Sequence, residues 1–332
     1  MRFSIHLIVF AMVVYLSNGN SDDDAWNAYK FEYKKDYSSS SEDDIHKAIF
    51  LAHRQQINQH NSGASLSYRK ELNRFSDMWP SEKSKYLGLK SSMAPSSQLM
   101  MKSIHLGHLL GSQQALSVKF DYRSDICMAA VKDQGSCGSC WAFAAVAPIE
   151  FNYCKKHKQT PIVLSEQQLV DCDKIDGGCS GGWYTQTWKY IKITGGIVRD
   201  SKYPYTATQS SCPIPFWFFL ASARVFMISY IPANDAVTMQ VALQKLGPLA
   251  VAFAVAESFY SYMDGVYDDT DCDNLDVNHA MVIVGWGNQN GLDYWIVRNS
   301  WGTGWGDSGY VLIQRGVNKC QIEFYAAFVL PF

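Results

Sequence analysis

The order of apolar and polar residues changes along the chain from a helical pattern to a strand-like one. Between Asp22 and about Asn61 the chain is charged and favours helix. Six positions there recur at intervals of four, four, three, four and four, which places them on one helix face: Glu42, His46, Phe50, His53, Ile57 and Asn61. Residues 140–156 are mostly apolar and predict another helix. A further helix is expected from about Leu164, with Ser165 as its N-cap.

The C-terminal part of the chain predicts β-strands separated by glycine-rich turns: residues 249–255, 279–286, 293–298 and 309–314. A helical half followed by an antiparallel half is typical of an α+β protein with two lobes. Residues 72–78 predict a short strand or a turn. Residues 91–117 are rich in Ser, Gln, Leu and Met without a clear period, which favours a linker where proteases cut.

Composition narrows the class of protein. The chain has 332 residues, 47% hydrophobic and 18% charged, so it can bury a sizeable core and is neither disordered nor collagen-like. Its 29 Lys and Arg residues against 31 Asp and Glu residues leave no basic excess, so a nucleic-acid partner is not expected. All nine cysteines lie between Cys127 and Cys320, and an odd number leaves one thiol without a partner in an oxidising compartment.

The first nineteen residues indicate that compartment. Arg2 precedes an apolar stretch at 5–16, and small residues follow at 17–19, which predicts a secretory signal peptide at 1–19 cleaved near Gly19. The apolar run is too short to span a bilayer, which needs about 20 residues. We therefore expect a protein of the secretory pathway, either extracellular or lysosomal, without a membrane partner.

The densest chemical signal is the segment 134–143, Gln-Gly-Ser-Cys-Gly-Ser-Cys-Trp-Ala-Phe. Its Cys137 and Cys140 allow three interpretations: a thioredoxin-like redox couple, half of a metal site, or one structural cysteine beside one nucleophile. The chain lacks the βαβ pattern of the first. Cys172 and Cys179, seven residues apart, do not match the spacing of a zinc site. The third interpretation requires a histidine and an orienting amide elsewhere in the chain.

Both groups follow in the strand-rich half. His279 begins a predicted strand 139 residues after Cys140, and Asn299 lies in Asn-Ser-Trp-Gly, 159 residues after it. Together these segments resemble the papain-like cysteine proteases, of the cathepsin L-like branch. The resemblance implies an α+β fold with a helical left lobe at about 127–230, an antiparallel β-barrel-like right lobe at about 231–332, and the active-site cleft between them.

The resemblance covers nearly the whole chain after the signal peptide. The face from Glu42 to Asn61 is similar to the family's propeptide signature, except that His46 replaces an Arg and His53 an Asn. Residues 73–77 are similar to a second propeptide motif, and Asp-Tyr-Arg at 121–123 resembles the start of the mature enzyme. We therefore expect an inhibitory propeptide at 20–116 and a mature peptidase at 117–332, with cleavage around 116–119.

The resemblance assigns catalytic roles to four residues. Cys140 would be the nucleophile, because a helix N-terminus and the imidazolium of His279 both favour its thiolate. Asn299 would orient the His279 ring, and Trp301 would shield that contact from water. Gln134 would donate its side-chain amide to the oxyanion, with the Cys140 backbone N–H as the second donor. Neither a cofactor nor a metal is expected.

The resemblance also implies the disulfides and the substrate site. The expected bridges are Cys137–Cys179, Cys172–Cys212 and Cys272–Cys320, and the two remaining cysteines give Cys127–Cys154 by similarity to cathepsin B-like enzymes. Gly181, Gly182 and Asn278 would bind the substrate backbone. The wall of the pocket for the second residue before the scissile bond would hold Ala252, Val277, Ala280 and Tyr325, which favours Leu, Val or Phe there.

The expected activity is that of an endopeptidase acting on polypeptides, made as an inactive zymogen and inhibited by its own propeptide and by cystatin-like proteins. Between Cys140 and His279 there is no insertion with paired histidines, and residues 20–116 lack cysteine, unlike in exopeptidase relatives. Two alternatives remain: a catalytically silent binding protein and a disulfide oxidoreductase. The apolar stretch 213–220 replaces a polar segment of relatives and is a buried strand, an exposed patch or a gene-model error.

Overall fold

The computed structural model describes residues 22–96, 116–213 and 221–332. The predicted signal peptide, most of the 91–117 segment and nearly all of the apolar stretch 213–220 lie outside the described residues. The chain divides into two compact units: residues 1–63 with 72–79, and residues 64–71 with 80–332. Within the described residues, none of the helices combines the length and the apolar character needed to cross a bilayer.

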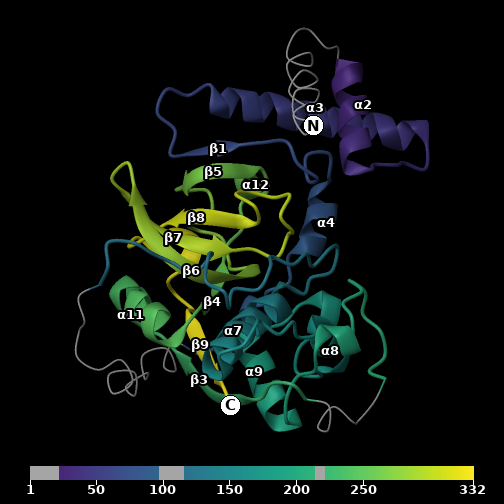
Figure 1. Cartoon of the computed structure of the whole chain (residues 1–332). Helices are drawn as coiled ribbons and strands as arrows, with labels where there is room; N and C mark the ends of the chain where they lie inside the picture. Colours follow the sequence, from purple (N-terminus) through teal and green to yellow (C-terminus); the bar gives the residue numbers. More distant parts are fainter. Residues whose placement is uncertain (1–21, 97–115, 214–220) are drawn as a thin grey trace, which may run out of the picture. The chain divides into compact units, whose positions relative to one another are not determined.

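The first unit consists of two helices and a turn (Figure 1). The charged N-terminal region forms helix α2 (Asp22–Tyr33) and helix α3 (Ser40–Asn61). The Ser39 side chain caps α3 by accepting from the Glu42 backbone N–H. The six-residue face lies within α3, and its members His46, Phe50 and Ile57 are buried. Residues 72–78, predicted as a strand or a turn, form a turn.

Asp77 organises the polar interior of this first unit. Its carboxylate accepts hydrogen bonds from the Tyr29 hydroxyl at 2.8 Å and from the Lys35 ammonium at 2.6 Å. His46 Nδ1 meets the Asp77 carbonyl oxygen at 2.8 Å, and His53 Nδ1 meets that of Ser76 at 2.6 Å. Both histidines that depart from the propeptide signature therefore tie α3 to the turn.

The second unit contains the helices and strands of the candidate peptidase. Its longest described helix is α7 (Cys140–His157). The shorter helical segments are α4 (Pro80–Lys83), η1 (Ser84–Tyr86), η2 (Ser91–Met93), α8 (Glu166–Cys172), η3 (Gly178–Ser180), α9 (Tyr184–Thr194), η4 (Asp200–Lys202), α11 (Ala236–Leu246), α12 (Glu257–Tyr260) and η5 (Lys319–Gln321). The Ser165 side chain accepts from the Gln168 backbone N–H, so Ser165 caps α8.

Nine described strands form a mixed sheet: β1 (Tyr68–Lys70), β2 (Phe120–Asp121), β3 (Val225–Tyr230), β4 (Leu249–Phe253), β5 (Tyr262–Tyr267), β6 (His279–Gln289), β7 (Leu292–Arg298), β8 (Tyr310–Gln314) and β9 (Ala327–Pro331). The order is β1-β5-β8-β7-β6-β4-β9-β3, and β2 pairs with β6. The pairs are antiparallel except for β5 with β8, which run parallel. The sequence pattern indicates strands but not that β5 pairs with β8, because pairing depends on residues far apart in the chain.

Helix α7 joins the helical side of this unit to the sheet. It packs against α8 and α9 and against strands β4, β6 and β9, as can be followed in Figure 1. One apolar core contains residues of α7 such as Trp141, Ala145 and Ile149, together with residues of the sheet such as Val282 and Val329. The mostly apolar sequence of 140–156 is explained by this burial on more than one side. The N-terminus of α7 is thereby held at a fixed place relative to β6.

Candidate active site

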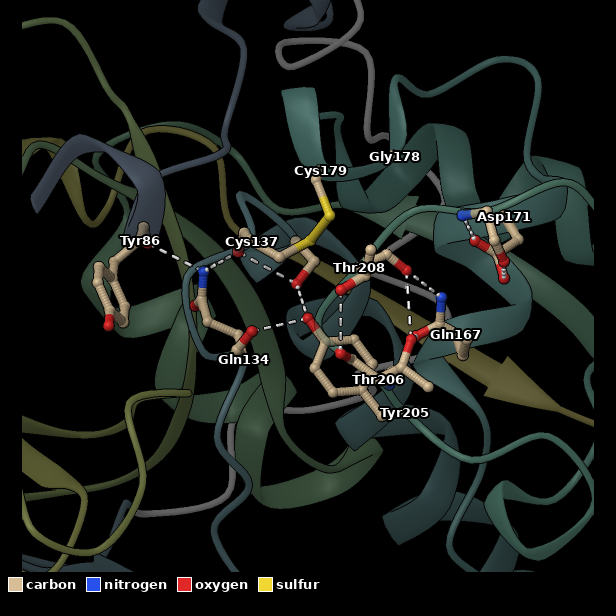
Figure 2. Close-up of a disulfide and its surroundings, with 12 residues drawn as sticks. Tyr86, Gln134, Cys137, Gln167, Asp171, Gly178, Cys179, Tyr205, Thr206 and Thr208 are labelled. Carbon is tan, nitrogen blue, oxygen red and sulfur yellow. Dashed lines mark hydrogen bonds between the residues drawn. A yellow bond between two sulfur atoms is a disulfide. The ribbon is translucent and has the colours of Figure 1, made fainter. Parts of the chain in front are cut away.

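Cys140 is the first residue of α7 and is fully buried. The other eight cysteines pair in four bridges: Cys127–Cys154, Cys137–Cys179, Cys172–Cys212 and Cys272–Cys320. These are the pairs that the resemblance implied, and Cys140 is the free thiol. The bridge from Cys137 fixes the loop immediately before the helix to the loop at Cys179 (Figure 2).

His279 and Asn299 meet because β6 and β7 are neighbours in the sheet. His279 is the first residue of β6, and Asn299 directly follows β7. His279 Nε2 lies 2.8 Å from Asn299 Oδ1, and the ring of Trp301 lies 4.9 Å from the imidazole. His279 Nδ1 is buried and has no hydrogen-bond partner within the described part of the chain. The ring is thus held through one nitrogen, and the other is available for proton transfer.

Burial favours the uncharged forms of the Cys140 thiol and the His279 ring. Burial raises the pKa of Cys140 to about 12, although backbone N–H groups of Ala280 and Gly88 donate to the sulfur and favour its anion. Burial lowers the pKa of His279 to about 4, against the effect of the Asn299 hydrogen bond. The thiolate–imidazolium pair is therefore expected only when water reaches the two side chains.

Gln134 lies beside Cys140 with its side-chain amide fixed from both ends. Its Nε2 donates to the carbonyl oxygens of Tyr86 at 3.0 Å and of Cys137 at 2.9 Å (Figure 2). Its Oε1 accepts from the Ser300 hydroxyl at 2.6 Å. Both N–H bonds of the amide are therefore used. Departure of the Tyr86 carbonyl would free one of them, which is what an oxyanion donor requires.

The segment 84–93, within the expected propeptide, contacts the candidate site through the residues between η1 and η2. The Gly88 carbonyl accepts from the Gly182 backbone N–H at 2.9 Å, and the Lys90 N–H donates to the Gly182 carbonyl at 3.2 Å. The Leu89 N–H donates to the Asn278 carbonyl at 3.0 Å. The backbone groups of Gly182 and Asn278, both predicted to bind substrate, are thus occupied. Leu89 pairs with Gly182 in a parallel bridge.

The residues predicted to form the specificity wall lie in the same core. Ala252 and Ala280 are paired across β4 and β6, and both are buried, as is Val277. The Tyr325 ring packs edge-on against Trp183 at 5.2 Å, and the Tyr184 hydroxyl donates to the Tyr325 carbonyl. The residues predicted for the wall are therefore apolar or aromatic, and Trp183, which the sequence reasoning did not select although it directly follows Gly182, packs against one of them.

Sequence reasoning also missed Ser300 and Tyr205. Ser300 directly follows Asn299, so its position beside the site could have been noticed, and it holds the Gln134 amide. Tyr205 lies 65 residues from Cys140 in a loop and carries no local motif. Its hydroxyl donates to the Gln134 carbonyl at 2.8 Å (Figure 2). Only the fold brings this residue to the site.

Comparison with protein families and known proteins gives a consistent result. Residues 116–330 match the family described as "Papain family cysteine protease", and residues 26–82 match the "Cathepsin propeptide inhibitor domain (I29)". The chain is 37% identical over 315 residues to a cathepsin L-like proteinase of Fasciola hepatica, covering 92% of this chain and 93% of that protein. It is 35% identical over 309 residues to cathepsin L of Sarcophaga peregrina, covering 90% and 89%.

Solved structures agree with these sequence matches. The structure of digestive procathepsin L2 proteinase from the larval midgut of Tenebrio molitor superposes with a TM-score of 0.86 at 34% identity. The alignment covers 93% of this chain and 100% of that one. The α+β fold expected from the resemblance is confirmed by this match.

Proposed function

Since the chain belongs to the papain family of cysteine proteases, as a cathepsin L-like pro-enzyme with an I29 propeptide, we propose that it is an endopeptidase acting through Cys140, His279 and Asn299. The observation that carries this proposal is the hydrogen bond between His279 and Asn299 at 2.8 Å, beside the one free thiol of the chain. The same residue types in this arrangement serve nucleophilic attack on carbonyls.

The reaction follows from the positions of these groups. The Cys140 thiol transfers its proton to His279 Nδ1, and the thiolate attacks the substrate carbonyl carbon. The resulting oxyanion accepts hydrogen bonds from the Cys140 backbone N–H and from the Gln134 N–H that the Tyr86 carbonyl now occupies. Collapse breaks the C–N bond, and His279 returns the proton to the leaving amine. Water then attacks the acyl-enzyme, with His279 as the base, and restores the thiol.

The zymogen form is silent because the 84–93 segment covers this machinery. The Gly88 N–H donates to the Cys140 sulfur. The propeptide backbone therefore occupies the position beside the thiol that a substrate would need. With the site also desolvated, the neutral thiol and imidazole predominate over the ion pair.

The substrate would bind Gly182 and Asn278 through its backbone and fill the pocket beside them with an apolar side chain. Ala252, Val277, Ala280 and Tyr325 would form that pocket, and none of them offers a carboxylate to an arginine. Preference for Leu, Val or Phe at the second residue before the scissile bond follows. The apolar Leu89 of the propeptide, paired with Gly182, supports this preference.

The remaining parts of the proposal concern processing and location. We propose a signal peptide at 1–19, a propeptide at 20–116 released by cleavage around 116–119, and a mature enzyme at 117–332. The four disulfides favour an oxidising compartment, so the protein would be extracellular or lysosomal. Cystatin-like proteins would be its inhibitors.

The test is cleavage of fluorogenic peptides after maturation of the zymogen in acid. Peptides with Phe, Leu or Arg at the second position before the scissile bond and Arg at the first are compared. We expect activity with Phe and Leu, at least about tenfold lower kcat/KM with Arg, and none in Cys140→Ala. Equal turnover of the Arg peptide would contradict the proposed preference, and retained activity in Cys140→Ala would contradict the mechanism.

A further inference from the structure

The hydroxyl of Tyr205 lies between the two segments that carry the candidate oxyanion donors. It is 2.8 Å from the Gln134 carbonyl oxygen and 2.6 Å from the Ser139 hydroxyl (Figure 2). Because a carbonyl can only accept, Tyr205 donates to Gln134 and accepts from Ser139. Ser139 directly precedes Cys140, whose backbone N–H is the second donor. One phenol thus connects the Gln134 backbone with the side chain of the residue that precedes Cys140.

Tyr205 completes the fixation of Gln134. On the opposite side, the Gln134 backbone N–H donates to the Ser300 carbonyl at 2.8 Å, and the Ser300 hydroxyl holds the Gln134 Oε1. Ser300 thereby fixes Gln134 to the segment after β7, whereas Tyr205 fixes it to the helix that starts at Cys140. Without the phenol, Gln134 keeps its Nε2 bond to the Cys137 carbonyl but loses the link through Tyr205 to Ser139, the residue before Cys140.

Tyr205 itself is anchored from the helical side. Its ring packs edge-on against Phe143 of α7 at 4.9 Å, and its backbone N–H donates to the Asp200 carboxylate at 3.1 Å. The next residue, Thr206, donates its backbone N–H and its hydroxyl to the buried Gln167 side chain of α8 at 2.8 and 3.0 Å. These contacts, of which that between Thr206 and Gln167 can be followed in Figure 2, place the hydroxyl without reference to Gln134.

We propose that Tyr205 is a positioning residue that sets the distance between the two oxyanion donors, Gln134 Nε2 and the Cys140 backbone N–H. The proposal rests on the proposed function, which assigns those donors. Oxyanion donors stabilise the transition state only when both lie about 2.7–3.1 Å from the developing charge. A hydroxyl that links the Gln134 backbone to Ser139, next to Cys140, therefore affects the rate of acyl transfer rather than the binding of substrate.

The test compares Tyr205→Phe with Tyr230→Phe in the acid-matured enzyme. Tyr205→Phe keeps the ring on Phe143 and removes only the hydroxyl. Tyr230→Phe removes a similar hydroxyl–hydroxyl bond, that to Thr185 at 2.8 Å, away from the donors. We expect Tyr205→Phe to lower kcat for a peptide amide about tenfold with little change in KM, less than the roughly hundredfold or greater loss on removing a donor itself. Tyr230→Phe should retain the wild-type kcat.

Two further readouts separate positioning from a general structural effect. Alkylation of Cys140 by iodoacetamide expels iodide and forms no oxyanion, so its rate should be the same in Tyr205→Phe and wild type. In a Gln134→Ala background, Tyr205→Phe should lower kcat by less than about twofold, because the donor that it positions is absent. A tenfold loss in that background, an equal loss of alkylation rate, or an unchanged kcat in Tyr205→Phe alone would overturn the proposal. If the wild-type enzyme cleaves no peptide, the proposed function itself fails.

Discussion

Gly88 of the expected propeptide lies directly on the backbone of Gly138 in the loop before the nucleophile. A Cβ atom on Gly88 would be 1.8 Å from the Gly138 carbonyl oxygen, far closer than two non-bonded heavy atoms can approach. The contact is between two backbones, so no flexible side chain can move aside. The absence of a side chain at Gly88 therefore permits the segment to cover Cys140.

Gly88→Ala should weaken autoinhibition. The alanine methyl group forces the segment away from Gly138 and exposes Cys140, so the uncleaved zymogen should react with iodoacetamide at least about tenfold faster than wild type at neutral pH, since burial controls thiol reactivity. The matched control is Gly304→Ala, because a Cβ at Gly304 meets nothing within 4 Å. Equal labelling rates of the Gly88→Ala and wild-type zymogens would show that the segment is not held by this contact.

The pH dependence of thiol alkylation should differ between zymogen and mature enzyme. In the zymogen, burial raises the pKa of Cys140 to about 12, so the thiolate fraction and the alkylation rate should increase about tenfold per pH unit between pH 7 and 9. In the mature enzyme, water reaches the site, and the helix N-terminus and the His279 cation favour the thiolate. The mature rate should be nearly constant over that range.

The measurement is the rate of iodoacetamide incorporation at a series of pH values, with Cys140→Ser as the blank. The Asn299→Ala variant of the mature enzyme provides a second comparison, because it removes the partner of His279 Nε2. Its profile should become steeper than that of the wild type. Identical profiles for the zymogen and the mature wild type would contradict the assignment of the pKa shift to burial.

Lys132 lies between two buried carboxyl groups where α7 meets α8, and burial raises the pKa of Glu166 to about 7 against the effect of the Lys132 cation. Its ammonium lies 2.7 Å from Glu150 and 2.6 Å from Glu166, and both carboxylate side chains are almost fully buried. Lys132→Met should lower the free energy of unfolding by about 3–5 kcal/mol, because both carboxylates lose their cation. The change is measured by urea denaturation of the zymogen. Adding Glu166→Gln to Lys132→Met should recover part of the loss.

The control for the Lys132 ion pairs is a more exposed ion pair, which joins α7 to Asp125. Lys155 lies 2.8 Å from Asp125, and its side chain is 47% exposed. Lys155→Met should change the free energy of unfolding by only about 0–1 kcal/mol, because solvent screens an exposed pair. If Lys132→Met is no more destabilising than Lys155→Met, the buried carboxylates do not depend on the Lys132 cation.

The sequence predicted those parts of the site that depend on local motifs. Characteristic neighbouring residues surround each of Cys140, His279 and Asn299. The residue types after Ser165 indicate that a helix begins there. These motifs can be recognised in the sequence because the chemistry requires specific side chains at adjacent positions. The break between α2 and α3 is less clear in the sequence, since residues 22–61 favour helix throughout, yet Ser39 starts a new helix.

Other features depend on contacts between distant residues and could not be read from the chain. The Tyr205 hydroxyl reaches Gln134 because the loop after η4 is anchored by Gln167, 39 residues from Thr206. The parallel pairing of β5 with β8 joins strands that are more than 40 residues apart in the chain, and no local pattern indicates it. The raised pKa of the Cys140 thiol follows from its burial. No property of the 134–143 motif indicates this burial.

The loop that presents Gly182 is supported by a buried pair of carboxyl groups, Asp173 and Asp176. Asp176 accepts from the Trp183 backbone N–H at 2.8 Å and from the Thr187 hydroxyl at 3.1 Å, and the two aspartates hydrogen-bond with each other. Burial, together with the neighbouring Asp173 charge, raises the pKa of Asp176 to about 8. Near neutral pH, the protonated form of Asp176 is therefore favoured.

This proton makes the stability of the loop depend on pH. The unfolded chain releases it near the ordinary aspartate pKa of about 4, whereas the folded chain keeps it to about pH 8. The folded state binds more protons in this range, so the stabilisation from Asp176 is complete below about pH 4 and is lost as the pH rises through 8. Asp176→Asn keeps an acceptor for Trp183 and a donor for Asp173 without titrating.

We expect Asp176→Asn to reduce the loss of unfolding free energy between pH 4 and 8 by at least about 1.4 kcal/mol, the equivalent of one pKa unit. The measurement is urea denaturation of the Cys140→Ser zymogen, which cannot cleave itself, at each pH. The control is Asp235→Asn, since Asp235 caps α11 through the Thr238 N–H and lies outside the Gly182 loop. Its stability should follow the pH curve of the parent protein. An Asp176→Asn curve parallel to the parent would mean that Asp176 is already ionised at neutral pH.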